Sequence, residues 1–297
     1  MRQNFHQTSY LLHIEHAKKA ARWRNESDEL PSIIASPGSI DAHRHERMYD
    51  FLRPLVGSFP LSSWMTIGDT GADAFWLKER GVKDIMATSL TCDAIDLVKD
   101  KGYLEFVDIK AINAEYVDLP DDSVDIVLCK ETFHHLPRAP VAFYELLRVC
   151  RKAVVYIEPA EPRGIRLLDC LRSSAKRLLR RQASIEQIFE VSGNFIYKLS
   201  ENELRKQATA MQLDTIAFRY FNDFYHSKLS AKKRAQKSAM MMFKFGVAVQ
   251  DFLCTVKLMN YARIVCIVFK NEIDQQSERA LRGYGYSVEH LPQNPYV

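Results

Sequence analysis

The sequence predicts an α/β protein built on a doubly wound, mostly parallel sheet of seven strands. Five short apolar runs between residues 64 and 158 alternate with segments in which apolar residues recur at helical spacing. This alternation is typical of βαβ units, in which parallel strands are covered by helices on both faces of the sheet. Two further apolar runs, at 214–221 and 262–269, complete the seven expected strands.

Each element is expected from a local pattern. The expected strands are the apolar runs 64–68, 84–90, 104–109, 124–129, 153–158, 214–221 and 262–269. The helices expected between them cover 72–81, 92–102, 139–150 and 200–212. The last of these begins with a capping box formed by Ser200 and Glu203. A further helix is expected to start from an N-cap at Asp41.

The pattern of elements predicts one main domain at residues 41–275. A helical extension is expected before it, at 1–40, and a tail after it, at 276–297. Two helical insertions, at about 160–198 and 226–258, are expected to form a lid over the site. Each carries a basic cluster that is either a solvated helix face or a contact with an anionic partner. The clusters are Arg172, Lys176, Arg177, Arg180 and Arg181, and Lys228, Lys232, Lys233, Arg234 and Lys237.

Composition indicates an ordinary globular protein, with 47% hydrophobic and 26% charged residues and a net charge of +4. The six cysteines stand singly, which indicates reduced thiols in a cytoplasmic protein rather than a disulfide framework. No apolar stretch has the length of a transmembrane segment, and the N-terminal residues lack a signal-peptide core. The scattered histidines, among them His43 and His45, lack the spacing of metal ligands, so they are interpreted as structural and no metal is expected.

The first turn of the expected sheet, IGDTGADAFWL, stands where doubly wound proteins bind ligands, beyond the carboxyl ends of the strands. Gly68 and Gly71 allow a sharp turn and a close approach of the backbone to a ligand. The helix that follows directs its first N–H groups toward the same place. The second strand ends at Ser89, where many nucleoside-binding sheets have an acidic residue that binds the ribose hydroxyls.

Residues 112–159 carry a more specific pattern. Its members are Ala114, Glu115, Leu119, Pro120, Asp125, Val127, His134, His135, Leu136, Glu145, Arg148 and Val149. Together with the turn GDTGADAFWL, this pattern closely resembles the class I S-adenosylmethionine-dependent methyltransferases, which have a Rossmann-like fold. The resemblance covers about residues 64–160 and is strongest to a bacterial branch associated with surface-glycan biosynthesis.

The resemblance implies S-adenosylmethionine as the cofactor and a set of residues that bind it. Those at the methionine end would be Gly68, Asp69, Gly71, Asp73, Cys129 and Lys130. Ser89 occupies the ribose position, and Asn113, Ala114 and Glu115 would frame the adenine. The glycine pair that usually precedes the fifth strand is replaced by Arg151 and Lys152.

The stretch CKETFHHLPR supplies the candidate catalytic residues. Methyl transfer to a hydroxyl or amine requires removal of a proton, and histidine titrates near neutral pH. His134 or His135 can therefore act as the base, with Glu131 as an orienting partner or an alternative base. The structural interpretation is that one histidine caps the next segment and the other packs beneath the cofactor. Glu158 is expected to face the same crevice, in either role.

The predicted function is methyl transfer to a small molecule, a sugar or other glycan precursor that can carry a phosphate. One alternative is an RNA or protein methyltransferase, which the basic insertions favour, although no aromatic-plus-basic nucleic-acid motif is present. A second is a non-catalytic, cofactor-binding partner subunit, which Ser89 and the missing glycines favour. The sequence leaves open contact with a membrane surface and assembly into a homo-oligomer.

Overall fold

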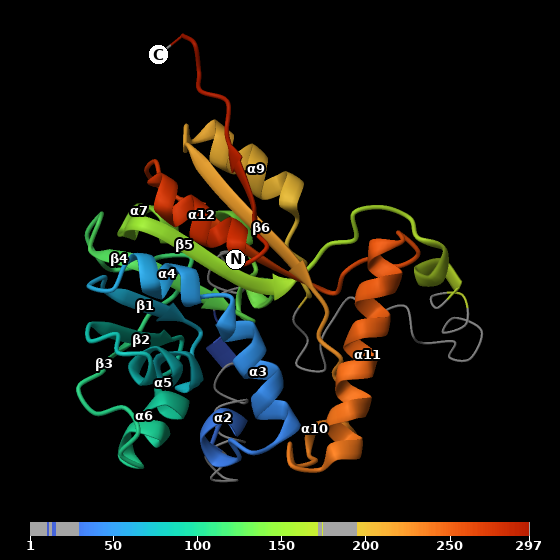
Figure 1. The fold of residues 1–297 in the computed structure, drawn as a ribbon. Helices are drawn as coiled ribbons and strands as arrows, with labels where there is room; N and C mark the ends of the chain where they lie inside the picture. Colours follow the sequence, from blue (N-terminus) through green and yellow to red (C-terminus); the bar gives the residue numbers. More distant parts are fainter. Residues whose placement is uncertain (1–10, 12–13, 16–29, 172–173, 175–194, 297) are drawn as a thin grey trace, which may run out of the picture.

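The structure is a computed structural model that describes residues 11, 14–15, 30–171, 174 and 195–296 (Figure 1). Most of the helical extension expected at 1–40 lies outside these residues. The same is true of the basic cluster between Arg172 and Arg181 and of most of the first expected insertion. The second insertion is described in full.

A single eight-stranded sheet forms the centre of the fold, in the order β3-β2-β1-β4-β5-β7-β6-β8. Strands β1 to β5 run parallel, and β6, β7 and β8 join them in antiparallel pairs. This confirms the predicted α/β class and the doubly wound, mostly parallel sheet. The strands are β1 (Trp64–Ile67), β2 (Ile85–Ser89), β3 (Asp108–Ala111), β4 (Val124–Lys130), β5 (Cys150–Pro159), β6 (Thr215–Phe221), β7 (Arg263–Phe269) and β8 (Ser287–His290).

Helices flank the sheet, and a group of them stands beyond its carboxyl-terminal edge (Figure 1). Those connected to the strands are α4 (Arg53–Ser58), α5 (Ala72–Glu79), α6 (Asp93–Asp100), α7 (Ala139–Val149), α9 (Glu201–Ala210) and α12 (Gln275–Gly283). The 3-10 helix η1 (Phe133–His135) follows β4. The group beyond the edge comprises α2 (Ser32–Ala35), α3 (Ile40–Asp50), α10 (Ser227–Ser230) and α11 (Lys237–Thr255). None of the helices in the described ranges combines the length and apolarity needed to cross a membrane.

The eighth strand lies in the region expected to be a tail. Residues of β8 pair with β6, and Tyr286, just before β8, is buried and donates a hydrogen bond of 2.8 Å to the carbonyl oxygen of Phe51. The tail and the count of seven strands are therefore corrected. Alternation over only four residues, Ser287–His290, is too short to identify an edge strand from sequence.

Three other local expectations are also corrected. The third strand is Asp108–Ala111 rather than 104–109, because Leu104 is buried in the core from a loop. Helix α3 is capped by Ser39, whose Oγ accepts a hydrogen bond of 3.0 Å from the Ala42 N–H, and Asp41 lies in its first turn. The capping box at Ser200 does not form, because Glu203 instead accepts a hydrogen bond of 2.8 Å from the Tyr197 hydroxyl.

Alternate residues of the central strands enter separate apolar layers on the two faces of the sheet. In β4, Ile126 and Leu128 belong to one layer, and Val127 and Cys129 belong to the other. The order of the strands changes direction between β1 and β4. The loops that leave these two strands therefore separate and leave a crevice at the carboxyl edge of the sheet.

Candidate active site

A cavity of about 590 Å³ lies at this crevice, within the range of about 300–1,000 Å³ that is typical of small-molecule sites. Its floor comes from the loops after β1 and β4 and from the start of α6, and its cover comes from the segment before α3 and from α3 itself. The lining residues are Leu30, Pro31, Ser32, Ile33, Ala35, Ser36, Asp41, His45, Gly68, Thr70, Ala72, Asp73, Ala94, Leu97, Lys130 and Glu131.

Two glycines shape the loop after β1. Gly68 has a φ of +66°, and a Cβ at this position would lie 2.3 Å from the side chain of Thr132. Gly71 has a φ of +89°, and a Cβ there would lie 2.7 Å from the side chain of Val98. The left-handed conformation and the close approach both make any residue with a side chain energetically costly at these two positions. Gly68 lines the cavity, whereas Gly71 is the N-cap of α5.

Asp69 holds this loop together from within. Its carboxylate is buried and accepts hydrogen bonds from the N–H groups of Gly71, Asp73 and Ala74 at 2.8, 3.1 and 2.9 Å. It also accepts one from the Thr66 hydroxyl at 2.9 Å. Because Asp69 occupies these amides of the first turn of α5, its side chain organises the loop and does not line the cavity.

Asp73 and Lys130 form a buried pair on the cavity wall. Lys130 Nζ lies 3.4 Å from Asp73 Oδ1 and 4.8 Å from the centre of the Tyr49 ring. The Tyr49 hydroxyl donates a hydrogen bond to the same carboxylate. Burial, partly opposed by Lys130, raises the pKa of Asp73 to about 6. Burial alone would lower the pKa of Lys130, but Asp73 and Glu131 outweigh it and keep the ammonium charged.

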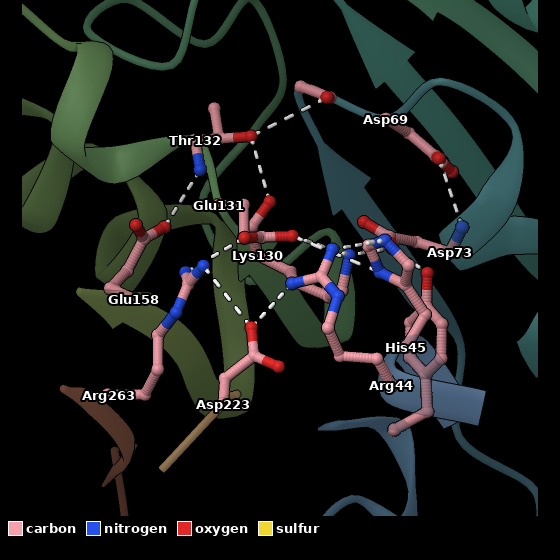
Figure 2. A network of polar contacts seen from close by, with 12 residues as sticks. Arg44, His45, Asp69, Asp73, Lys130, Glu131, Thr132, Glu158, Asp223 and Arg263 are labelled. Atoms are coloured by element: carbon pink, nitrogen blue, oxygen red, sulfur yellow. Dashed lines mark hydrogen bonds and ion pairs between the residues drawn. The ribbon is translucent and has the colours of Figure 1, made fainter. Parts of the chain in front are cut away.

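Glu131 stands at the centre of a charged network (Figure 2). Its Oε1 lies 2.8 Å from Nη1 of Arg263, and its Oε2 lies 3.6 Å from Lys130 Nζ. Burial would raise the pKa of Glu131, but the nearby cations Lys130 and Arg263 outweigh burial and lower it well below its usual range. The residue has a φ of +50°, an uncommon conformation for a residue with a side chain. Backbone strain of this kind concentrates at functional sites.

Residues of α3 and of the segment after β6 complete the network, and the sequence did not indicate them. Arg44 Nη1 contacts Asp223 Oδ2 at 2.5 Å, and Arg263 Nη2 lies 3.6 Å from the same oxygen. His45 lines the cavity, and burial, together with the charges of Lys130 and Arg44, lowers its pKa to about 4. His45 is therefore neutral near pH 7. The run DAHRHE, at residues 41–46, could have indicated Arg44 and His45 as site residues, because it places several ionisable side chains on one helix.

Several of the residues predicted to bind cofactor lie outside the lining of the cavity. Ser89 is half-buried, and Ala114 and Cys129 are buried among apolar side chains. The Asn113 side chain accepts a hydrogen bond of 3.0 Å from the Glu115 N–H. Glu115 in turn accepts hydrogen bonds from the N–H of Arg138 at 2.5 Å and from its Nε at 2.8 Å, at the start of α7. The polar contacts of Asn113 and Glu115 thus fix loops beside the crevice.

The two histidines of the HHLPR stretch also lie outside the lining of the cavity. Glu158 is fully buried, and its Oε2 lies 2.6 Å from His134 Nδ1. Its other oxygen accepts hydrogen bonds from the N–H groups of Thr132 and Phe133 at 2.9 and 2.8 Å. The rings of His134 and His135 lie 3.9 Å apart. Of the three predicted catalytic residues, Glu131 alone contributes to the lining.

The chemistry of the lining fits S-adenosylmethionine. The methionine end of that molecule carries an ammonium and a carboxylate, and the cavity offers the Asp73 carboxylate and the Lys130 ammonium close together. The apolar side chains of Ile33, Ala94 and Leu97 provide surface for the nucleoside. When bound, S-adenosylmethionine supplies an electrophilic methyl group on a sulfonium sulfur.

Comparisons with known proteins identify the same fold and domain. Residues 66–157 match the methyltransferase domain family. No curated protein matches the sequence. The YcgJ protein from Bacillus subtilis is similar, with 18% identity and a TM-score of 0.50 over 76% of this chain and 100% of that one.

A second similar structure is the Burkholderia thailandensis 1,6-didemethyltoxoflavin-N1-methyltransferase, solved with 1,6-didemethyltoxoflavin and S-adenosylhomocysteine bound. It shares 11% identity and a TM-score of 0.51, covering 92% of each chain. Likenesses at these identities show the fold, and the family match supplies the activity. The chain therefore contains a methyltransferase domain at residues 66–157 and is an S-adenosylmethionine-dependent methyltransferase.

Proposed function

We propose that this protein methylates a small molecule in the cavity between the carboxyl ends of β1 and β4. The observation that carries the proposal is the lining itself, in which Gly68, Asp73, Lys130 and Glu131 meet at the change in strand order. Ligands of doubly wound sheets bind at this position. The cover from α3 adds Asp41 and His45 to this lining.

The charged pair on the wall fits the methionine end of the cofactor. Asp73 accepts hydrogen bonds from the ammonium group, and Lys130 donates to the carboxylate. Asp69 and Gly71 serve this arrangement indirectly, by fixing the loop that places Gly68 and Asp73 at the wall. The roles proposed for Ser89, Asn113, Ala114, Glu115 and Cys129 are to frame the crevice beside the nucleoside.

The acceptor is held on the side of the cavity formed by Glu131. With both molecules bound, a lone pair of the acceptor would form a bond to the methyl carbon as the carbon–sulfur bond breaks and S-adenosylhomocysteine leaves, and the proton of an acceptor hydroxyl or amine would pass to a base or to solvent. Glu131 stays ionised because of its cationic neighbours, so it orients the donor group of the acceptor and does not retain the proton. His134 and His135 remain candidates for the base. For either to act, its ring must reach the cavity, whose lining includes neither.

A sugar or other glycan precursor is the acceptor that we favour. The polar wall of Asp41, His45 and Glu131 suits a molecule with several hydroxyl groups. The sequence resemblance to the surface-glycan branch supports the same class. The similar Burkholderia structure, which holds 1,6-didemethyltoxoflavin, supports a small molecule over a macromolecule. The free cysteines among the described residues support a reducing compartment, the cytoplasm.

Two measurements test the function. Isothermal titration of the full chain with S-adenosylhomocysteine is expected to give saturable binding. If the folded protein does not bind this ligand, the proposed methyltransferase activity is contradicted. Transfer of a labelled methyl group to nucleotide sugars and sugar phosphates is then compared with transfer to RNA. Activity on sugars that depends weakly on salt supports the proposal, because few phosphate contacts are involved. Tight RNA binding that falls steeply with salt favours the macromolecular alternative.

A further inference from the structure

One surface of the described protein takes no part in the methyltransferase site and is unusually apolar. It is the outward side of α11, whose five residues Met241, Met242, Phe245, Val249 and Phe252 we call the apolar face. Met241, Phe245 and Phe252 are 70%, 69% and 64% exposed. Met241, Phe245, Val249 and Phe252 follow one another at intervals of four, four and three residues, so they form one stripe along the helix.

The opposite side of α11 anchors the helix to the protein. Ala239, Phe243 and Val247 are buried in a small apolar cluster with Ile40 of α3 and Leu229 of α10. This buried side of α11 packs the helix against the rest of the fold. The apolar face is therefore not needed for that packing. Figure 1 shows α11 at the edge of the molecule, away from the sheet. Contiguous exposed apolar surface of this kind marks an interaction site.

The charge around the apolar face is mostly positive, and the acid of α11, Asp251, accepts a hydrogen bond of 2.8 Å from the Asn222 side chain. Residues 224–250 contain no aspartate or glutamate and carry six cations, which are Lys228, Lys232, Lys233, Arg234, Lys237 and Lys244. Lys237 and Lys244 belong to α11 and flank its apolar stripe, and both are exposed. Arg234 is partly paired with Glu46 at 2.9 Å. The rest of the group presents positive charge beside exposed Met and Phe side chains.

From this combination we propose that α11 binds in the plane of an anionic membrane surface, with the apolar face in the headgroup region and the lysines against lipid phosphates. A helix with a continuous apolar face and lysines at its border is the form of an interfacial membrane helix. Each lysine near an anionic leaflet adds to the attraction, and the apolar side chains add the burial that charge alone lacks.

Charge favours the membrane over the other occupants of an apolar face. A second copy placed on α11 brings another segment with six cations and no acid, so like charges meet. A nucleic acid satisfies the lysines but leaves the Met and Phe side chains of the stripe without a role. An anionic bilayer satisfies both parts of the surface at once.

Backbone hydrogen bonds join the proposed contact to the cover of the active site. The Ile40 N–H donates a hydrogen bond of 2.8 Å to the Lys232 carbonyl, and the Arg234 N–H donates one of 2.6 Å to the Gly38 carbonyl. These bonds join the basic segment to the start of α3, which carries the cavity residues Asp41 and His45. A membrane-bound α11 is therefore joined through this segment to the helix that covers the cavity.

Flotation of the full-chain protein with vesicles tests the proposal. We expect binding to vesicles of phosphatidylcholine mixed with phosphatidylglycerol, at least about tenfold weaker binding to phosphatidylcholine alone, and weakening as salt rises. The variant Met241→Ser/Phe245→Ser/Phe252→Ser should bind anionic vesicles at least about tenfold more weakly, and Lys237→Gln/Lys244→Gln should do the same. All five positions are exposed, so S-adenosylhomocysteine binding and the melting temperature should be retained and report intact folding.

Matched controls remove the same chemistry elsewhere. Leu61 and Phe106 are 95% and 97% exposed, and Leu61→Ser/Phe106→Ser should bind vesicles like the original protein. The charge control is Lys83→Gln/Lys206→Gln, at two exposed lysines outside the segment. Protein that stays in solution with anionic vesicles overturns the proposal, as does undiminished binding by the serine variant. If the protein is a dimer that binds no vesicles and dissociates on the serine substitutions, the apolar face binds a second copy. If the protein binds RNA more tightly than vesicles, the basic segment binds nucleic acid. Either result also overturns the proposal.

Discussion

Two polar clusters lie at the carboxyl ends of the neighbouring strands β4 and β5, and they have different surroundings. In the first, Glu158 is fully buried, and its carboxylate contacts Thr132, Phe133 and His134. In the second, the cavity cluster, Asp73, Lys130 and Glu131 line an open space. The first cluster is closed around one carboxylate, whereas the second has charges directed at a volume that a ligand can enter.

The difference teaches that the position of an ionisable residue next to a strand end does not determine its function. Glu131 and His134 are three residues apart, yet the first lines the cavity and the second lies outside the lining, in contact with Glu158. The turn at Glu131, with a φ of +50°, separates the two directions. We expect the first cluster to serve stability and the second to serve binding.

The largest effect is expected from Glu158→Ala. The substitution removes the acceptor of the buried Phe133 N–H, of the half-buried Thr132 N–H and of the buried His134 ring, and a buried group that loses its acceptor costs about 1–3 kcal/mol. The free energy of unfolding should fall by about 3–5 kcal/mol in chemical denaturation. Glu161→Ala, at an exposed acid close by, should change it by less than about 0.5 kcal/mol. If both variants lose the same small free energy of unfolding, the Glu158 cluster does not stabilise the fold.

Gly68→Ala should affect both stability and binding. A residue with a Cβ in the left-handed region costs about 1–2 kcal/mol, and the clash with Thr132 adds to it, for a total of about 2–4 kcal/mol. Gly81→Ala is the matched control, because Gly81 has a φ of +83° with nothing within 4 Å of its added Cβ. Gly81→Ala should lose only the conformational part and keep S-adenosylhomocysteine affinity. If titration shows that Gly68→Ala binds normally, the loop after β1 does not shape the cofactor site.

Asp73→Asn should weaken S-adenosylhomocysteine binding by about 10- to 100-fold, because a hydrogen bond to a charged group contributes about 1.5–3 kcal/mol. The pH dependence gives a second readout. With the pKa of Asp73 at about 6, the affinity of the original protein should fall below that pH as the carboxylate is protonated, and the affinity of the variant should not. An unchanged affinity in the variant would remove Asp73 from the ammonium site.

The same residue predicts a stability profile of definite sign. The pKa of Asp73 is raised above its ordinary value, so the folded protein holds a proton that the unfolded chain has lost between about pH 4 and 6. The contribution of Asp73 to the free energy of unfolding therefore falls by about 3 kcal/mol as pH rises through this window. The variant Asp73→Asn should lack this fall in denaturation curves taken across the window.

The smallest effects are expected in kcat, where substitutions of Glu131 and His134 should differ. Glu131→Gln should lower kcat about tenfold or more, since the acceptor loses its orienting carboxylate, with a smaller change in cofactor affinity. His134→Gln should lower the melting temperature and leave kcat within about tenfold. A hundredfold loss of kcat in His134→Gln or His135→Gln with intact cofactor binding would instead identify a general base.

Much of the fold was readable from the sequence because the evidence for it is local. The run from Val124 to Lys130 is apolar enough to be a central strand, and the glycine turn at Gly68 requires a left-handed backbone. The strand at Ser287–His290 was missed because four alternating residues carry too little signal. The candidate binding residues Gly68, Asp73 and Lys130 followed from the family resemblance, and each of them lines the cavity.

The sequence by itself determined the class of sheet and the place of the crevice, because periodicity and turn chemistry act over a few residues, and its resemblance to a known family implied the cofactor. Only the tertiary structure decided which ionisable residues share that crevice. Arg44, Asp223 and Arg263 come from distant parts of the chain and meet Glu131 through packing of α3 against the sheet edge. Long-range packing also buried His134 against Glu158 and left one side of α11 exposed, and neither outcome is encoded in local spacing.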